Sequence, residues 1–356
     1  MDIYKFLTQI KRLLVLKKLL NTFYITKQGS YLRKEGDTIV VEFEGNVAMR
    51  IPLHNLSSII AFGNVMVSPF LLGACAEKGI CVSMLTEYGK FLARVEGPVS
   101  GNVFLRVAQI RAYENKEKKA DIAKSFVIGK IYNTKMVLQR RIRDHGETRN
   151  IIVAEEKQKD VLHKLKYVPS EVERIRSLEG EAAAAYFSAF SDMIVAQKND
   201  FYLTSRQRRP PMDPMNALLS FLYTLLAHEC VAALESVGLD PQIGFLHELR
   251  PGRPALALDL MEEFRAIIAD RIALNLVNLR QITSSGFTIT ESGAVLMKDD
   301  TRKKLLTVWQ EKKQEEITHP FLEEKIQIGL LPYAQALLLS RYLRGDFDAY
   351  PPYLTR

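Results

Sequence analysis

The chain has 356 residues, of which 47% are hydrophobic and 25% charged, so it is long enough to bury a sizeable core and unlike a disordered chain. Its formal charge of +8 suits a polyanionic partner without establishing one. Cys75, Cys81 and Cys230 have no disulfide or metal-knuckle spacing, which indicates reduced thiols in a cytoplasm. The longest apolar run, 217–227, is shorter than the about 20 residues that cross a bilayer, and no signal peptide precedes it.

The residues up to about 101 are typical of β structure. Short alternating segments predict strands at 22–26, 38–43, 47–53 and 57–63, with a turn at 44–46. Ser68 followed by proline predicts a helix start, and Gly79 its end. A further strand pair is expected on either side of the turn residues "TEYGK". This half contains no glycine-rich phosphate loop.

Long helical patterns follow. Val127, Ile131, Leu138 and Ile142 share one helix face, and "SEVE" at 170–173 is typical of a capping box that opens a second helix. A polar, arginine-rich loop at 198–214 precedes an apolar helix that starts near residue 215. The predicted fold class is α+β, with a small β-rich domain at 1–101 and a larger all-α domain at 102–356.

One carboxylate interrupts an apolar helix stripe. Glu179 lies four residues after Ile175, three before Ala182 and seven before Tyr186, in the middle of the face that should turn inward. A buried carboxylate needs a compensating cation. A metal ion and a buried arginine both meet that need, and a place at the edge of the stripe would remove it. The pattern leaves these three readings open.

Further polar residues stand near apolar segments later in the chain. His247 ends the short segment "IGFLH", and a helix pattern from residue 255 carries Asp259 and Glu262 on one face. Glu263 falls elsewhere and is expected to be solvated. Imidazole and carboxylates form a ligand set for Mn²⁺ or Mg²⁺, but a hydrogen-bonded core histidine and acids that complement a helix dipole are equally compatible. Zinc-protease and nucleophile-elbow motifs are absent from the sequence.

Three blocks, "EGEAAAAYF", "RRPPMDPMNALLSFLYTLL" and "GLDPQIGFLHELRPGRPALALDLMEEFR", strongly resemble the CRISPR-associated adaptation integrase, the first Cas protein. "LKKLLNTFYIT", "IPLHNLSSIIAFG" and "GNVFLRVAQ" are similar to its subtype I-C branch. The resemblance begins at about residue 16, so residues 1–15 are expected to be a non-family extension. It implies an N-terminal β domain that dimerises and a helical catalytic domain.

The resemblance also implies an activity. It assigns metal binding and catalysis to Glu179, His247 and Glu262, with Asp259 as a possible second acid and Asn216 and Tyr223 near the site. The implied protein is a prokaryotic, cytoplasmic, Mn²⁺- or Mg²⁺-dependent DNA endonuclease and integrase that inserts spacers into a CRISPR array. A 3′-hydroxyl would attack a phosphodiester at the edge of a repeat.

Implied partners are prespacer and repeat DNA, a second copy of the chain, and the small ferredoxin-like second Cas protein. Candidates for phosphate contacts, with ordinary solvated charge as the alternative for each, are Arg140, Arg141, Arg143, Arg206, Arg208 and Arg209. Two rival functions remain open at this stage. One is a metal-dependent nuclease that acts on branched DNA in repair, and the other is a non-catalytic DNA-binding scaffold.

Overall fold

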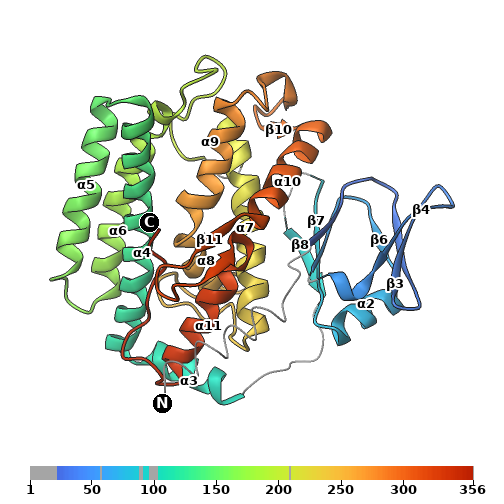
Figure 1. Cartoon of the computed structure of the whole chain (residues 1–356), viewed down its shortest axis with the longest axis horizontal. Coiled ribbons are helices and arrows are strands. Elements are labelled where there is room, and N and C mark those ends of the chain that lie inside the picture. The colour runs from blue at the N-terminus through green and yellow to red at the C-terminus, as the bar shows by residue number, and fades with distance from the viewer. Residues whose placement is uncertain (1–21, 57, 88–90, 96–102, 208–209, 356) are drawn as a thin grey trace. The chain divides into compact units, whose positions relative to one another are not determined.

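The computed structural model describes residues 22–355 apart from 57, 88–90, 96–102 and 208–209 (Figure 1). The predicted extension at 1–15 therefore lies outside the described residues. The chain divides into two compact units, and the main boundary falls between residues 101 and 102. Two short segments near the C-terminus, 314–318 and 325–330, belong to the first unit, which the sequence did not indicate.

The first unit contains two four-stranded sheets. One has the order β1-β5-β7-β8, with β1, β5 and β7 parallel and β8 antiparallel to β7. The other has the order β4-β3-β2-β6, and its β2–β3–β4 part is antiparallel. Their bounds are β1 Thr22–Ile25, β2 Tyr31–Glu35, β3 Thr38–Phe43, β4 Asn46–Pro52, β5 Ser58–Phe62, β6 Met66–Val67, β7 Cys81–Leu85 and β8 Phe91–Val95. Strands β2 and β6 were not predicted, whereas the others match predicted segments within a few residues.

One helix, α2 (Pro69–Glu77), completes the core of this unit. The Ser68 hydroxyl accepts a hydrogen bond from the backbone N–H of Leu71 at 3.2 Å, so the predicted N-cap is confirmed. Leu71 and Cys75 on α2 pack with apolar residues of both sheets, including Leu32 and Ile59. Burial of these side chains between α2 and the strands stabilises the core of this unit.

The second unit is mostly helical, and the α+β class is therefore correct. Its helices are α3 Val103–Glu114, α4 Lys116–His145, α5 Arg149–Leu165, α6 Val172–Ser188, α7 Pro214–Ser236, α8 Ala255–Glu262, α9 Arg271–Asn278, α10 Asp299–Gln314 and α11 Leu331–Leu343. A π-helical turn, Arg265–Asp270, links α8 to α9. Shorter elements of this unit are the 3₁₀ turns Phe190–Met193 and Ser284–Gly286 and the strand pair β9 Phe287–Ile289 with β10 Val295–Met297. The 3₁₀ turns Leu53–Asn55 and Ile328–Leu330 and the strand pair β11 Glu316–Thr318 with β12 Lys325–Gln327 belong to the first unit.

Helices α4, α5 and α6 pack side by side and bring the middle of α4 against α6 and α8 (Figure 1). Val127, Ile131 and Leu138 are buried, as the stripe on α4 predicted. The capping-box prediction for α6 is wrong: the N-cap is Glu171, and no side chain caps the helix. Because α6 begins one residue later than the motif requires, Ser170 is not in position to accept its hydrogen bond.

Helix α7 is long and apolar enough to cross a membrane by length and composition alone. However, 67% of its most apolar window is buried inside the protein. Leu218, Leu222 and Leu226 are at most 1% exposed. We therefore assign α7 as the core helix of the second unit.

Glu263 was predicted to be solvated, and this prediction is wrong because its side chain is fully buried. The hydroxyl of Tyr350 donates to Glu263 at 2.6 Å, and the backbone N–H of Tyr353 and the amide of Gln335 donate at 2.6 and 2.9 Å. Burial raises the pKa of Glu263 to about 8, although these donors act in the opposite direction. The C-terminal segment thus covers a position that a helix pattern alone leaves open to solvent.

Candidate functional site

The centre of the site is a lysine between two carboxylates. The ammonium of Lys130 on α4 bonds Glu179 Oε1 on α6 and lies 2.9 Å from Glu262 Oε2 on α8. Glu179 is half-buried and Glu262 almost completely buried. Two acids 83 positions apart in the chain (262 − 179) therefore share one cation, which answers why Glu179 interrupts an apolar stripe.

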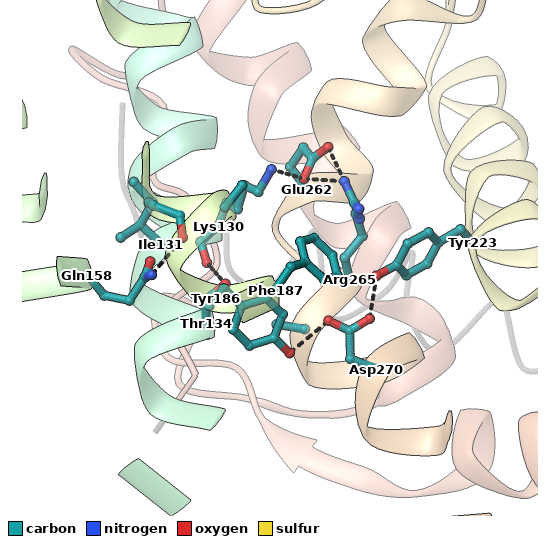
Figure 2. A pocket seen from close by; sticks show the side chains of 13 residues that line it. Lys130, Ile131, Thr134, Gln158, Tyr186, Phe187, Tyr223, Glu262, Arg265 and Asp270 are labelled. Carbon is teal, nitrogen blue, oxygen red and sulfur yellow. Dashed lines mark hydrogen bonds and ion pairs between the residues drawn. The ribbon is translucent and has the colours of Figure 1, made fainter. Parts of the chain in front are cut away.

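Glu262 has a second cationic partner one helical turn away. Arg265 Nη1 donates to both carboxylate oxygens of Glu262, at 2.7 and 3.0 Å (Figure 2). Burial by itself would raise the pKa of Glu262, but the charges of Arg265, Lys130 and His247 outweigh burial and lower it. Glu262 is therefore an ionised carboxylate at neutral pH, ready to bind a cation.

Arg265 is in turn fixed by an aromatic and acidic cluster. Its guanidinium lies 4.3 Å from the ring centroid of Tyr223, a geometry that favours a cation–π contact. The hydroxyls of Tyr223 and Tyr186 both donate to the buried Asp270, at 2.5 and 2.9 Å (Figure 2). Burial raises the pKa of Asp270 above its ordinary value, while Tyr223 and Arg265 lower it.

A cavity of about 20 Å³, room for about one water molecule, lies among these side chains. Its lining includes Lys130, Tyr186, Glu262, Arg265 and Asp270. The π-helical turn that carries Arg265 and Asp270 is a rare conformation that is frequent at functional sites. These polar side chains therefore line a small cavity between the helices.

His247 is held by the buried carboxylate of Asp259. Its ring Nδ1 lies 2.7 Å from Asp259 Oδ1, and its backbone N–H donates to the same oxygen at 2.9 Å. Asp259 Oδ2 accepts the backbone N–H groups of Phe245 and Leu246 at 2.6 and 2.9 Å. An ionised carboxylate only accepts hydrogen bonds, so the ring Nδ1 is the donor, and Nε2 of the neutral ring is left as the acceptor.

Two further side chains hold the loop that carries His247. Arg176 on α6 donates to the carbonyl of Leu246 at 2.7 Å and to Glu248 at 3.0 Å. Gln109 on α3, fully buried, donates to the carbonyls of Asp240 and Ile243 and accepts the backbone N–H of Asp240. The loop is thus fixed from α3, α6 and α8 before any ligand arrives.

The donor set suits a divalent cation. Carboxylates of Glu179 and Glu262 and the Nε2 of an imidazole oriented by a carboxylate are the ligand types that Mn²⁺ accepts. Among the described residues, however, no three His, Cys, Asp or Glu side chains are clustered as a preformed metal site. Lys130 occupies the place between the two carboxylates instead.

Asp259, the possible second acid, bonds the loop and the ring of His247, and its place near a metal stays a prediction. Its oxygens accept four hydrogen bonds, three from backbone N–H groups and one from the ring of His247. The carboxylate is fully buried. Its place is therefore behind His247, where it orients the ring.

The two residues predicted to lie near the site, Tyr223 and Asn216, occupy different positions. Tyr223 lines the cavity, whereas Asn216 is fully buried and does not. The side chain of Asn216 bonds Ser205, Gln207, Asp213 and Arg206 and so ties the loop before α7 to the helix. Arg206 also donates to Ser220 at 3.1 Å and lies 5.1 Å from the Tyr223 ring.

The other arginines predicted to contact phosphates also differ in their exposure and partners. Arg140 and Arg143 are exposed at the end of α4, and both pair with Asp144. Arg141 is committed to the fold, because it donates to the carbonyls of Asp192 and Gly146 at 3.1 and 2.9 Å. Arg208 and Arg209 lie outside the described residues.

Sequence reasoning missed Lys130, Arg265 and Asp270. Lys130 and Asp270 are charged residues next to apolar ones, as Glu179 is. Lys130 follows the buried Val127 by three residues, and Asp270 ends the apolar run "AIIA". Arg265 stands three residues after Glu262, which is the spacing of a helical ion pair. A charged residue inside an apolar pattern, whether acidic or basic, was thus the informative feature.

The fold and the site together define an α+β protein whose helical unit holds a buried, acidic, histidine-containing site. The family model for the CRISPR associated protein Cas1 matches residues 23–311, and the chain belongs to this family. It is 51% identical over 344 residues to "CRISPR-associated endonuclease Cas1 2" of Rhodospirillum rubrum, across 95% of this chain and 99% of the relative. The narrower likeness to the subtype I-C branch stays a prediction.

Solved structures agree with this assignment. A CAS1 protein from Thermotoga maritima matches with a TM-score of 0.80 at 25% identity, across 93% of this chain and 99% of its own. A casposase bound to its integration product matches with a TM-score of 0.81, also at 25% identity, across 94% of each chain.

Proposed function

We propose that this protein is a divalent-metal-dependent DNA endonuclease and integrase of CRISPR adaptation. The reaction would be a transesterification in which the 3′-hydroxyl of a captured DNA fragment attacks a phosphodiester at the edge of a repeat. Cleavage of branched, single- or double-stranded DNA is the same chemistry with water as the nucleophile. The names of the endonuclease relative and of the casposase support this class of activity.

The observation that carries the proposal is the convergence of Glu179 and Glu262 on one cation position. His247, whose Nδ1 is bonded to Asp259, is the third candidate ligand. Glu179, Glu262 and His247 would hold Mn²⁺ or Mg²⁺. When bound, such an ion stabilises the charge that develops on the phosphate and helps to deprotonate the attacking hydroxyl.

The chain's own residues supply orientation and charge. Asp259 holds His247 in one tautomer, so the ring nitrogen that faces away from Asp259 is an acceptor. Arg265 keeps Glu262 ionised and in one rotamer by its two hydrogen bonds. Glu179 is half-buried, which strengthens its charge interaction with a neighbouring cation.

DNA, a second copy of this chain and the small second Cas protein are the proposed partners, and a bacterial cytoplasm is the proposed location. Arg140 and Arg143 are exposed enough to contact phosphates, whereas Arg141 is not free to leave its carbonyl partners without a cost. Affinity for DNA should fall as salt rises if phosphate contacts dominate.

An integration assay tests the proposal. Purified protein is mixed with the small second Cas protein, a short DNA fragment and a repeat-bearing plasmid, in Mn²⁺, Mg²⁺ or chelator. We expect integration only with a divalent ion, and its loss in Glu179→Ala and His247→Ala. Cleavage without integration would favour a repair nuclease instead.

Glu181→Ala is the matched control, because Glu181 lies two residues from Glu179 on α6 but is exposed and pairs with Lys157. It should integrate at the wild-type rate. DNA binding and the melting temperature should be similar in all variants. Full turnover by Glu179→Ala in Mn²⁺ would contradict the site, and no turnover by the wild type would favour a non-catalytic scaffold.

A further inference from the structure

We propose that Lys130 is the resident counter-ion of the site and that a divalent ion binds by displacing its ammonium group. Lys130 thereby sets how tightly the site binds the ion. This inference rests on the proposed function, because that function supplies the ion.

The geometry places the ammonium where the ion must go. Lys130 bonds Glu179 Oε1 and lies 2.9 Å from Glu262 Oε2, so it engages an oxygen of each carboxylate. A metal held by both acids needs lone pairs on the same carboxylates. The ammonium and the metal therefore compete for one position between α4, α6 and α8, and Figure 2 shows the Lys130–Glu262 side of it.

The charge balance points the same way. Glu179 and Glu262 carry two negative charges, and the two cations that bond them, Lys130 and Arg265, carry two positive charges, while Asp270 adds a negative charge beside Arg265. A divalent ion added with both cations in place would bring two more positive charges next to Lys130 and Arg265 in a largely buried place, which is costly. Withdrawal of one cation from the carboxylates reduces that repulsion.

Lys130 is the cation that can withdraw. Arg265 is fixed by two hydrogen bonds from its Nη1 to Glu262 and by the ring of Tyr223, and its side chain is buried. Lys130 ends in a flexible four-carbon stem with rotatable donors, and 14% of its side chain is exposed. The stem can swing toward solvent while α4 stays in place.

Lys130 also accounts for the stability of the metal-free site. Without a cation, two carboxylates on neighbouring helices would repel each other at close range. The ammonium neutralises them and holds α4, α6 and α8 together, at the expense of metal affinity.

The test is direct Mn²⁺ binding by the full-length protein, measured by isothermal titration calorimetry and by the electron paramagnetic resonance signal of free Mn²⁺. The variants are Lys130→Met and Lys130→Gln. Lys135→Met is the control, since Lys135 lies on the same helix, 4.7 Å from the ring of Tyr132. We expect the Lys130 variants to bind Mn²⁺ about tenfold more tightly than wild type and the control to be unchanged.

Melting temperature gives a second readout. In chelator, Lys130→Met should melt below wild type, and saturating Mn²⁺ should raise its melting temperature by more than it raises that of wild type. If Lys130→Met does not fold without metal, Lys130→Gln, which keeps a hydrogen-bond donor, carries the comparison.

The outcomes separate the two proposals. Mn²⁺ binding by wild type that is lost in Glu179→Gln but is no tighter in either Lys130 variant overturns the counter-ion role and leaves the proposed function in place. Absence of Mn²⁺ binding by wild type would remove the metal site, and the counter-ion role with it.

Discussion

The ring of His247 and the carboxylate of Asp259 are joined by a hydrogen bond of 2.7 Å, while the same carboxylate accepts three backbone N–H groups of the loop that carries His247. One buried acid therefore sets the conformation of the loop and the tautomer of the ring. Carboxylate–histidine pairs of this kind tune metal ligands in many enzymes.

Replacement of Asp259 should show how much the orientation of the His247 ring contributes to metal binding. In Asp259→Asn the amide NH₂ group faces hydrogen-bond donors of the His247 loop, so one or more of these donors lose their acceptor. We expect Mn²⁺ affinity to fall by about 10- to 100-fold and the free energy of unfolding by about 1–3 kcal/mol. Calorimetric Mn²⁺ titration and denaturant unfolding measure the two effects. Glu181→Gln, a change at an exposed residue of α6 that pairs with Lys157, should alter neither quantity. Wild-type Mn²⁺ affinity in Asp259→Asn would refute the orienting role.

Arg176 should matter for the site although it lies outside the ligand set. Arg176→Met removes the donors to Leu246 and Glu248, so the loop of His247 gains freedom and the integration rate should fall about tenfold. Arg174→Met is the matched control, because Arg174 is exposed on the same helix and pairs with Glu171. Equal integration rates for the two variants would mean that Asp259 alone is sufficient to hold the loop.

His319 should make the stability of the second unit depend on pH. Burial lowers the pKa of His319 from 6.5 to about 4, although its bond with Gln335 raises it. The folded state thus binds fewer protons, so this contribution is fully present above pH 6.5 and is lost as the pH falls toward 4. It amounts to about 3 kcal/mol.

The variant that tests this is His319→Asn, whose side-chain oxygen can replace Nδ1 as the acceptor for the N–H groups of Phe321 and Leu322. Its free energy of unfolding should change less between pH 6.5 and 4 than that of the wild type. Denaturant unfolding at a series of pH values measures this. If the free energy of unfolding depends on pH in the same way in both proteins, the acid sensitivity comes from groups other than His319.

Asn133 should anchor the C-terminal segment to α4. Its amide donates to the carbonyls of Glu263 and Tyr353 at 2.7 and 2.8 Å, and its oxygen accepts the N–H of Thr355. Asn133→Ala leaves these buried groups without partners, so we expect a loss of about 3 kcal/mol in the free energy of unfolding. Asn150→Ala, at an exposed asparagine, should change it by less than about 0.5 kcal/mol. A similar small effect of Asn133→Ala would show that the segment is held mainly by Glu263.

Local patterns in the sequence were sufficient for the fold class, for most strands of the first unit and for the main helices. Ser68 before Pro69 predicted the start of α2, and the stripe of Val127, Ile131 and Leu138 predicted the buried face of α4. These features depend on contacts between residues close in the chain, whose spacing can be read directly. The capping box at Ser170 failed, because the choice between adjacent N-cap positions depends on how the chain enters the helix.

The sequence by itself also determined which residues are unusual: Glu179 within an apolar stripe, His247 after an apolar segment, and Glu262 within the block that resembles the integrase family. Only the tertiary structure decided which groups meet them. Lys130 is 49 positions from Glu179, and the C-terminal segment that buries Glu263 is about 90 positions away, so no helical period relates these pairs. The burial and charge of a side chain depend on neighbours brought by chain folding, and those neighbours decide what a carboxylate does.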